Sequence, residues 1–249
     1  MPSISNSRKP SDLLGGTAYP PLRPASRSLF RFCGFYTIIM PLKKARIPLV
    51  LAELAVLHPT APIALDFQSP FQLLVATILS AQCTDVRVNL VTPALFAAFP
   101  TAQAMAKASR KRLEALIHST GFFRNKAKNI LGASAAILRD HGGEVPRTLE
   151  ELVALPGIGR KTANVVLGDA FGIPGVTVDT HVGRLSRRLG FTKHADPVKV
   201  EFALNKLIPQ PDWTIVSHRL ILHGRAVCFA RKPACERCTL AEICPKVGV

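Results

Sequence analysis

The fold of this 249-residue chain is organised around the sequence Leu155-Pro156-Gly157-Ile158-Gly159-Arg160-Lys161-Thr162-Ala163. Two glycines follow a proline, which predicts a tight turn with unusual backbone dihedral angles. A helix should begin directly after the turn, because apolar residues then recur at helical spacing, at Ala163, Val166, Leu167 and Ala170. A second short helix is expected before the turn, over residues 148–153, with Thr148 as its N-cap and Glu151 completing a capping box.

A glycine hairpin between two helices directs backbone N–H groups outward at a helix N-terminus, and this geometry binds phosphate without reading base sequence. Lys161 falls in the first turn of the second helix. The positive end of the helix dipole disfavours a charged ammonium there, and burial would disfavour it further, so Lys161 is a candidate nucleophile. An ordinary turn with a solvated lysine is the alternative, and this stretch alone leaves both open.

Positive charge dominates the composition. The 32 Lys and Arg residues stand against 16 Asp and Glu residues, which gives a net charge of +16 and an isoelectric point near 10.2. A polyanionic partner explains this excess, with nucleic acid as the first candidate and a membrane surface as the second. No apolar run reaches the roughly 18 residues that a membrane-spanning helix needs, so we expect no membrane partner.

Residues 1–40 differ from the rest of the chain. They contain five prolines, five basic residues and one acidic residue, and no helical or strand period is sustained. We expect a disordered tail. Met40 is an alternative start of translation, and in that case the first 39 residues would be dispensable.

From residue 41 onward, helical patterns joined by short loops predict an all-α protein. Besides the hairpin pair, helices are expected over residues 45–58, 70–80, 85–99, 110–119, 125–141, 179–189, 197–208 and 213–230. Residues 175–178 are the one short stretch with strand-like composition.

Four cysteines near the C-terminal end are separated by six, two and five residues: Cys228, Cys235, Cys238 and Cys244. Four thiols this close together suit a metal site better than disulfides. Zinc sites usually use two Cys-x-x-Cys pairs, whereas this group has one, so the spacing favours an iron–sulfur cluster over zinc.

Asp179 precedes a predicted helix and is a suitable N-cap. It also follows Lys161 by only 18 residues, so its carboxylate could face the lysine and stabilise a developing positive charge. Residues 79–85 form a polar junction between two helices, with Thr84 or Asp85 as the cap.

The hairpin, the sequence Val178-Asp179-Thr180-His181 and the cysteine spacing, in this order, resemble the endonuclease III family of helix-hairpin-helix DNA glycosylases with lyase activity. The likeness covers about residues 41–246, including the sequences at 79–82 and 220–225. It implies a two-domain fold with a DNA groove between the domains. One is a six-helix barrel over residues 62–173, and the other is an iron–sulfur cluster domain over residues 41–61 and 174–249.

The resemblance also implies roles for single residues. Lys161 would form a Schiff base, and Asp179 would be the catalytic aspartate. Gln82 would fill the gap left by an extruded base, and Phe122 would be a second wedge, where the family often has leucine. Further DNA contacts would come from Gly157, Ile158, Gly159, Arg160, Arg231 and Lys232. A [4Fe–4S] cluster would be bound by Cys228, Cys235, Cys238 and Cys244.

The implied activity is excision of oxidised pyrimidines, such as thymine glycol, from double-stranded DNA, followed by β-elimination at the abasic site. The enzyme would be a cytoplasmic monomer, associated with the nucleoid if bacterial. Two alternatives stay open. Adenine glycosylases that act on mispairs share the hairpin and the cluster, although they usually lack the lysine and carry an additional C-terminal domain. A non-catalytic DNA-binding module would use the hairpin for phosphates alone, but the presence of both Lys161 and Asp179 argues against it.

Overall fold

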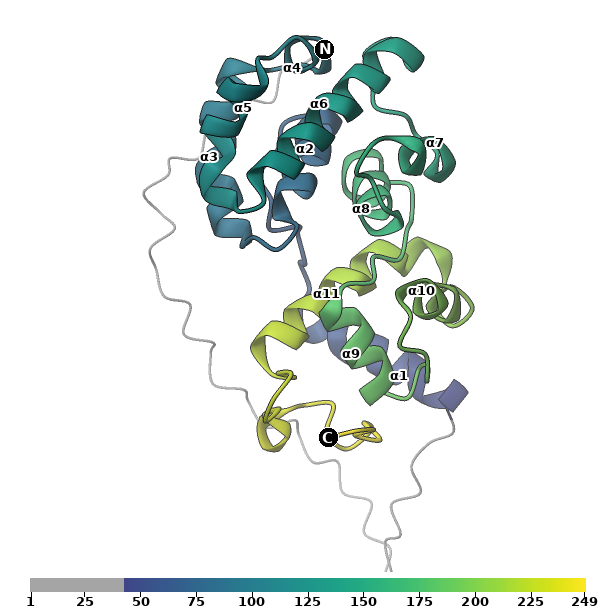
Figure 1. Cartoon of the computed structure of the whole chain (residues 1–249). Helices are drawn as coiled ribbons and strands as arrows, with labels where there is room; N and C mark the ends of the chain where they lie inside the picture. Colours follow the sequence, from purple (N-terminus) through teal and green to yellow (C-terminus); the bar gives the residue numbers. More distant parts are fainter. Residues whose placement is uncertain (1–42) are drawn as a thin grey trace, which may run out of the picture. The chain divides into compact units, whose positions relative to one another are not determined.

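The computed structural model describes residues 43–249, and the predictions for residues 1–40 lie outside this range. All regular structure in the described residues is helical, which confirms the predicted class (Figure 1). None of these helices is both long and apolar enough to cross a bilayer. The α-helices are α1 Lys43–Leu57, α2 Pro70–Ser80, α3 Asp85–Ala98, α4 Ala102–Ala106, α5 Arg110–Ile117, α6 Phe123–Asp140, α7 Leu149–Ala154, α8 Arg160–Phe171, α9 Thr180–Arg188, α10 Pro197–Asn205 and α11 Trp213–Ala226. Short 3₁₀ turns are η2 His118–Thr120, η3 Gln210–Asp212 and η4 Cys235–Arg237.

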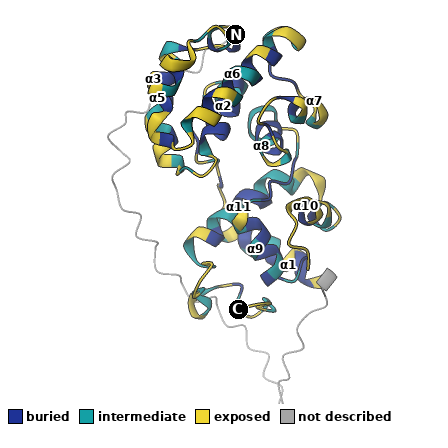
Figure 2. Ribbon diagram, in the orientation of Figure 1, coloured by how far each residue is buried: buried dark blue, intermediate teal, exposed yellow. Residues whose placement is uncertain are grey.

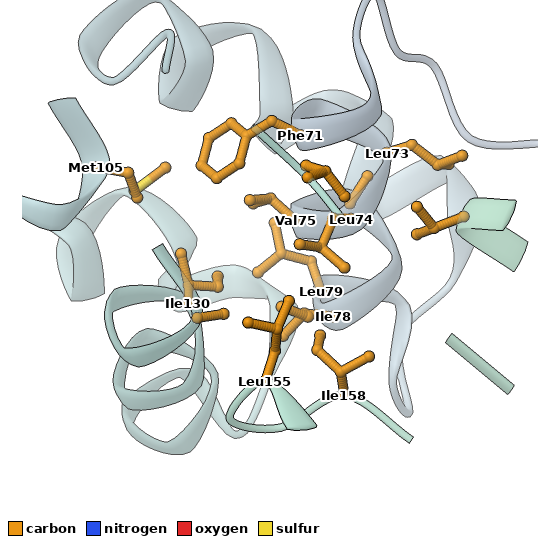
Figure 3. Packing of buried hydrophobic residues seen from close by; sticks show 14 of the residues in the cluster. Phe71, Leu73, Leu74, Val75, Ile78, Leu79, Met105, Ile130, Leu155 and Ile158 are labelled. Carbon is orange, nitrogen blue, oxygen red and sulfur yellow. The ribbon is translucent and has the colours of Figure 1, made fainter. Parts of the chain in front are cut away.

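Helix α2 lies in a first hydrophobic core to which α3 to α8 also contribute. Figure 3 shows its side chains beside Met105 of α4, Ile130 of α6 and the hairpin residues Leu155 and Ile158. The sequence of α2 is apolar on almost every side, and a helix of this kind is stable only when other elements cover it. The Ser69 hydroxyl begins the helix by accepting a hydrogen bond from the N–H of Gln72 at 3.2 Å. Leu74 is fully buried. Burying a leucine side chain contributes roughly 1.5–3 kcal/mol.

A second core brings together segments that are far apart in the sequence, namely α1 and the helices α9, α10 and α11 (Figure 1). Phe191 is its largest fully buried side chain, and Leu54 of α1 packs in the same cluster as Leu220 of α11. Figure 2 shows buried and exposed residues alternating along these helices, as expected when each turns one face to a core.

Residues 175–178 lead from α8 to α9 in an extended conformation and form no strand. Side chains of two helices bind their backbone groups instead. The Asn164 side-chain amide of α8 donates to the Val176 carbonyl at 2.8 Å, and the Ser217 hydroxyl of α11 accepts from the Thr177 N–H at 3.0 Å. The segment that ends at Asp179 is therefore fixed from both sides.

The predicted helices are confirmed in position, with shifted ends. α11 ends at Ala226 instead of residue 230, because the chain there turns into the cysteine loop and the N–H groups of Val227 and Cys228 both donate to the His223 carbonyl at 3.0 Å. α4 was not predicted, because its five residues are too short to show a period. Its start is nevertheless capped by the Thr101 hydroxyl.

Candidate active site

The predicted hairpin is present between α7 and α8. The Thr148 hydroxyl oxygen accepts from the N–H of Glu151 at 3.3 Å, and the hydroxyl donates to the Glu151 carboxylate at 2.6 Å. The predicted cap is confirmed, but the capping box is not, since the Glu151 side chain bonds the hydroxyl instead of the Thr148 N–H. Gly172, in the left-handed conformation, ends α8.

Only one hairpin glycine has the unusual dihedral angles that we predicted. Gly157 has φ of +76°, and a Cβ atom there would lie 2.5 Å from Cγ of Asn129. Gly159 has φ of −97°, and a Cβ atom there would meet open space. The prediction was therefore wrong for Gly159, whose open side leaves room for a large ligand to approach the backbone.

The hairpin presents unpaired backbone donors. Gly159 provides no side-chain cap for α8, so the N–H groups of Arg160, Lys161 and Thr162 have no partner in residues 43–249. Ile158 differs from them. Its side chain is buried in the first core and its N–H donates to the Leu155 carbonyl at 3.2 Å, so it anchors the hairpin and only its carbonyl is left to meet a ligand.

Arg160 is already engaged by another side chain. Its guanidinium donates to both carboxylate oxygens of Glu201 on α10, at 2.6 and 3.1 Å, and lies over the ring of Phe202. The hydrogen bond with Glu201 raises the pKa of Arg160. Arg160 thus ties the hairpin to α10, and a phosphate group would have to compete with Glu201 for it.

Lys161 and Asp179 lie in the same cleft, the arrangement that the sequence suggested. Two adjoining pockets form this cleft, and five residues line both of them: Ser80, Asp85, Lys161, Asp179 and Arg225. The larger pocket has a volume of about 660 Å³, which is enough for a ligand of nucleotide size.

The two side chains are held differently. Lys161 is exposed and has no hydrogen-bond or ion-pair partner among the described side chains, so burial does not act on its ammonium group. Asp179 is half-buried, and its Oδ1 atom accepts from the N–H of Val182 at 2.8 Å as the N-cap of α9. This cap fixes the carboxylate in the cleft.

The surroundings of Asp179 are positively charged. Burial lowers the pKa of His181, the neighbouring Asp179 opposes that shift, and Arg184 and Arg225 add to it. One Arg184 nitrogen lies 3.1 Å from Nδ1 of His181. A developing negative charge in the cleft would therefore meet several cationic groups.

Asp85 and Arg225 form an ion pair at 2.9 Å in this cleft. Asp85 belongs to the first turn of α3, whose cap is Thr84, and Arg225 to the last turn of α11. They are 140 residues apart, so no local pattern reveals the pair, although Arg225 stands in a stretch that the family resemblance quoted and Asp85 in the polar junction over residues 79–85.

Gln82 and Phe122 line a third pocket, next to Gly157 of the hairpin. Both have left-handed backbone conformations, with φ of 52° and 48°, which are uncommon for residues other than glycine. Phe122 is 64% exposed. An exposed phenylalanine in a strained conformation is a candidate functional residue.

All four predicted ligand cysteines line one cavity and are free thiols. Within residues 43–249, no three such side chains converge closely enough to hold a single ion. Burial raises the pKa of Cys238 and Cys244. Thiolates there require nearby positive charge, which a metal centre would supply and to which Arg188 contributes by donating to Sγ of Cys228 at 3.3 Å. Four cysteine thiols that line one cavity are the donor set that an iron–sulfur cluster uses. Arg231 and Lys232 lie exposed in the loop between the first two cysteines.

Comparison with known proteins agrees with this architecture. Residues 75–210 match the HhH-GPD superfamily of base excision DNA repair proteins, and residues 228–244 match the iron-sulfur binding domain of endonuclease III. The chain is 62% identical over 207 residues to an endonuclease III of Synechocystis sp., covering 83% of this chain and 94% of that protein. It is 46% identical over 200 residues to the endonuclease III of Bacillus subtilis, covering 80% and 91%.

Two solved structures are also similar, each with a TM-score of 0.79 and 45% identity over 83% of this chain and 97% of the other. One is a trapped covalent intermediate of endonuclease III with DNA, and the other is a non-covalent endonuclease III–DNA complex. A thermostable thymine-DNA glycosylase, at 21% identity and a TM-score of 0.73, shares the fold.

Proposed function

Because this chain belongs to the endonuclease III family of bifunctional DNA glycosylases and abasic-site lyases, we propose that it excises oxidised pyrimidines through a Schiff base on Lys161. The observation that carries this proposal is that Lys161 and Asp179 line one cleft at the end of the hairpin. A similar endonuclease III was captured in a covalent intermediate with DNA, which supports a covalent step.

Lys161 is the proposed nucleophile. Its amine attacks the anomeric carbon of the sugar and loses a proton, while the damaged base leaves with the bonding electrons. The bond between the anomeric carbon and the ring oxygen then breaks, the nitrogen lone pair forms the C=N bond of an iminium, and the ring oxygen takes up a proton. The iminium makes the neighbouring sugar proton acidic, so that its removal expels the 3′ phosphate by β-elimination. No carboxylate among the described residues pairs with Lys161, which leaves its side chain free to reach the sugar.

Asp179 is the proposed electrostatic partner. Its cap bond to the Val182 N–H uses one oxygen and fixes the orientation of the carboxylate. A fixed carboxylate stabilises the positive charge that develops on the sugar as the base leaves, and it can accept a proton. Asp85 and Arg225 line the same cleft, and their ion pair places one further negative and one further positive charge beside the reacting sugar.

The hairpin is the proposed phosphate-binding element. Three unpaired N–H groups at the start of α8 and the open side of Gly159 suit a DNA phosphate, which is read without regard to base sequence. A base inside a duplex cannot reach Lys161, so the nucleotide must be extruded. We propose that Gln82 and Phe122 enter the space that it leaves.

We propose that the bound iron–sulfur group is a [4Fe–4S] cluster, held by the four cysteines of the C-terminal loop: Cys228, Cys235, Cys238 and Cys244. When bound, its iron ions would supply the positive charge that the four thiolates require, and the cluster would tie this loop to the second core. It would have no redox part in base removal. The exposed Arg231 and Lys232 of the same loop are proposed phosphate contacts. We further propose that the two cores are the two domains of a monomer, with bounds as predicted from the sequence.

Borohydride trapping tests the proposed chemistry. Duplexes that carry thymine glycol, an abasic site or no damage are incubated with the protein and borohydride, which reduces an imine to a stable covalent adduct. We expect adducts with the first two duplexes and none with the third. Lys161→Gln should abolish both the adducts and strand cleavage but leave DNA binding largely intact, whereas Lys107→Gln, an exposed lysine beside α4, should behave like the wild type. Wild-type adduct levels in the Lys161 variant would identify another amine as the nucleophile.

A further inference from the structure

Lys126 of α6 is only 4% exposed, although its side chain ends in an ammonium group. A buried charge of this kind is costly unless its hydrogen bonds are made within the protein. Its Nζ atom donates to the Leu79 carbonyl at 2.7 Å and to the Thr120 carbonyl at 2.8 Å. Both acceptors are backbone groups, and they belong to two different segments, α2 and η2.

Each of these carbonyls stands at the end of a helical segment. Leu79 is in the last turn of α2, where the next turn leaves its carbonyl without a helical partner, since the N–H of Cys83 donates to Ser80 instead. Thr120 is the last residue of η2. The Lys126 ammonium therefore satisfies the carbonyl groups at the ends of both helical segments, and its charge interacts favourably with the negative end of the α2 dipole.

The residues that follow these two carbonyls are the proposed DNA-inserting side chains. Gln82 comes three residues after Leu79, and Phe122 comes two residues after Thr120. Both have left-handed backbone conformations, and both line one pocket together with Lys126. The backbone N–H of Lys126 also donates to the Phe122 carbonyl at 3.1 Å, so that the lysine holds this loop at two points.

We propose that Lys126 is a positioning residue that holds the Gln82 and Phe122 loops at a fixed separation, so that both side chains enter the duplex together. This inference rests on the proposed insertion of those two side chains. Left-handed conformations at residues with side chains persist only where the surroundings impose them. Without the Lys126 ammonium that binds both carbonyls, the two loops would be free to relax independently. Gln82 and Phe122 would then be placed together for insertion less often.

A role limited to fold stability would lower the melting temperature and change nothing specific to base extrusion. Single-turnover excision separates the two roles. One duplex carries thymine glycol paired with adenine and a neighbouring 2-aminopurine, whose fluorescence reports unstacking. A second duplex carries the same lesion opposite a tetrahydrofuran analogue of an abasic site, which an amine cannot attack and where less pairing opposes extrusion. The assay temperature is kept well below the melting midpoint of every variant.

We expect Lys126→Met to slow unstacking and excision about tenfold on the paired duplex and to have little effect on the second duplex. Two controls on α6 should match the wild type on both: Ser134→Ala, a buried hydroxyl that bonds the Ile130 carbonyl at 2.7 Å, and Lys128→Met, an exposed lysine. In a Gln82→Ala/Phe122→Ala background, Lys126→Met should add no further loss, because the groups that it positions are gone.

The proposal would be overturned if Lys126→Met slowed excision equally on both duplexes. It would also be overturned if the effect of Lys126→Met added fully to that of the Gln82→Ala/Phe122→Ala double variant. If Lys126→Met does not fold, Lys126→Gln replaces it, since an amide still donates hydrogen bonds. Either of two results with Lys126→Gln would count against the proposal. One is a wild-type extrusion rate although its hydrogen bonds to the two carbonyls are shown to be broken, and the other is an equal loss on both duplexes. Wild-type excision together with unchanged unstacking in the Gln82→Ala/Phe122→Ala protein would refute insertion itself, and with it the role of Lys126, while leaving the lysine chemistry at residue 161 intact.

Discussion

Gly157→Ala should destabilise the protein much more than Gly159→Ala, although both changes add one methyl group to the same hairpin. At Gly157, φ of +76° costs a residue with a side chain about 1–2 kcal/mol. The new Cβ atom would also lie 2.5 Å from Cγ of Asn129, and overpacking of this kind costs roughly 1–3 kcal/mol. The reduced entropy of the unfolded chain returns about 0.4–1 kcal/mol, and the middle of these ranges leaves a net loss of roughly 3 kcal/mol.

For a chain of this size, that loss should lower the melting temperature by about 5–15 °C, measured by circular dichroism at the helix band. Gly159→Ala should melt within about 2 °C of the wild type, because its φ of −97° suits alanine and its Cβ atom meets open space. Its effect should appear in DNA affinity instead, where the methyl group obstructs the approach of a phosphate. Adding Asn129→Ala should recover part of the loss caused by Gly157→Ala, because the crowding is shared between the two side chains. Equal melting temperatures for the two glycine variants would refute this account of the turn.

Three further predictions follow from ion pairs, exposed charge and the cysteine cavity. Glu201→Gln should lower the melting temperature by about 2–4 °C, since its carboxylate is buried and its partner is partly exposed, whereas the more exposed Glu114→Gln should have no measurable effect. Arg231→Ala and Lys232→Ala should each reduce the log–log salt slope of duplex binding by up to about one unit without changing the preferred lesion; an altered lesion preference would place the loop at the base pocket. Wild-type protein should contain iron and absorb broadly in the visible range, and Cys238→Ser should lose both; zinc without iron in protein prepared without oxygen would contradict the cluster.

Features set by neighbouring residues could be predicted from the sequence. Thr148 and Asp179 cap helices where the pattern places them, and α2 is buried as its continuous apolar sequence requires. The cysteine spacing similarly predicts a shared cavity. In each case the interacting groups are close along the chain, so local geometry and hydrophobic period carry the necessary information.

The features that were not predicted depend on contacts between distant segments. Arg160 meets Glu201 across 41 residues, and Asp85 meets Arg225 across 140, so neither ion pair leaves a local signature. The exposure of Lys161 was not predictable for the same reason. It depends on whether a distant segment covers the start of α8, and the neighbouring sequence carries no information about that. The composition of the hairpin likewise does not distinguish the glycine that needs a positive φ from the one that faces open space.

Charge in the cleft is set by helix ends. α3, α8 and α9 all begin at this cleft, so the partial positive charges of three helix N-termini meet there. Two of these helices carry a carboxylate at their start, Asp85 and Asp179, which offsets the local field. The third begins with no side-chain cap and carries Lys161 instead. The uncompensated end is thus the one at which we propose that phosphate binds, and an acidic residue placed at position 159 should weaken that binding because its carboxylate would repel the phosphate and cap the free N–H groups.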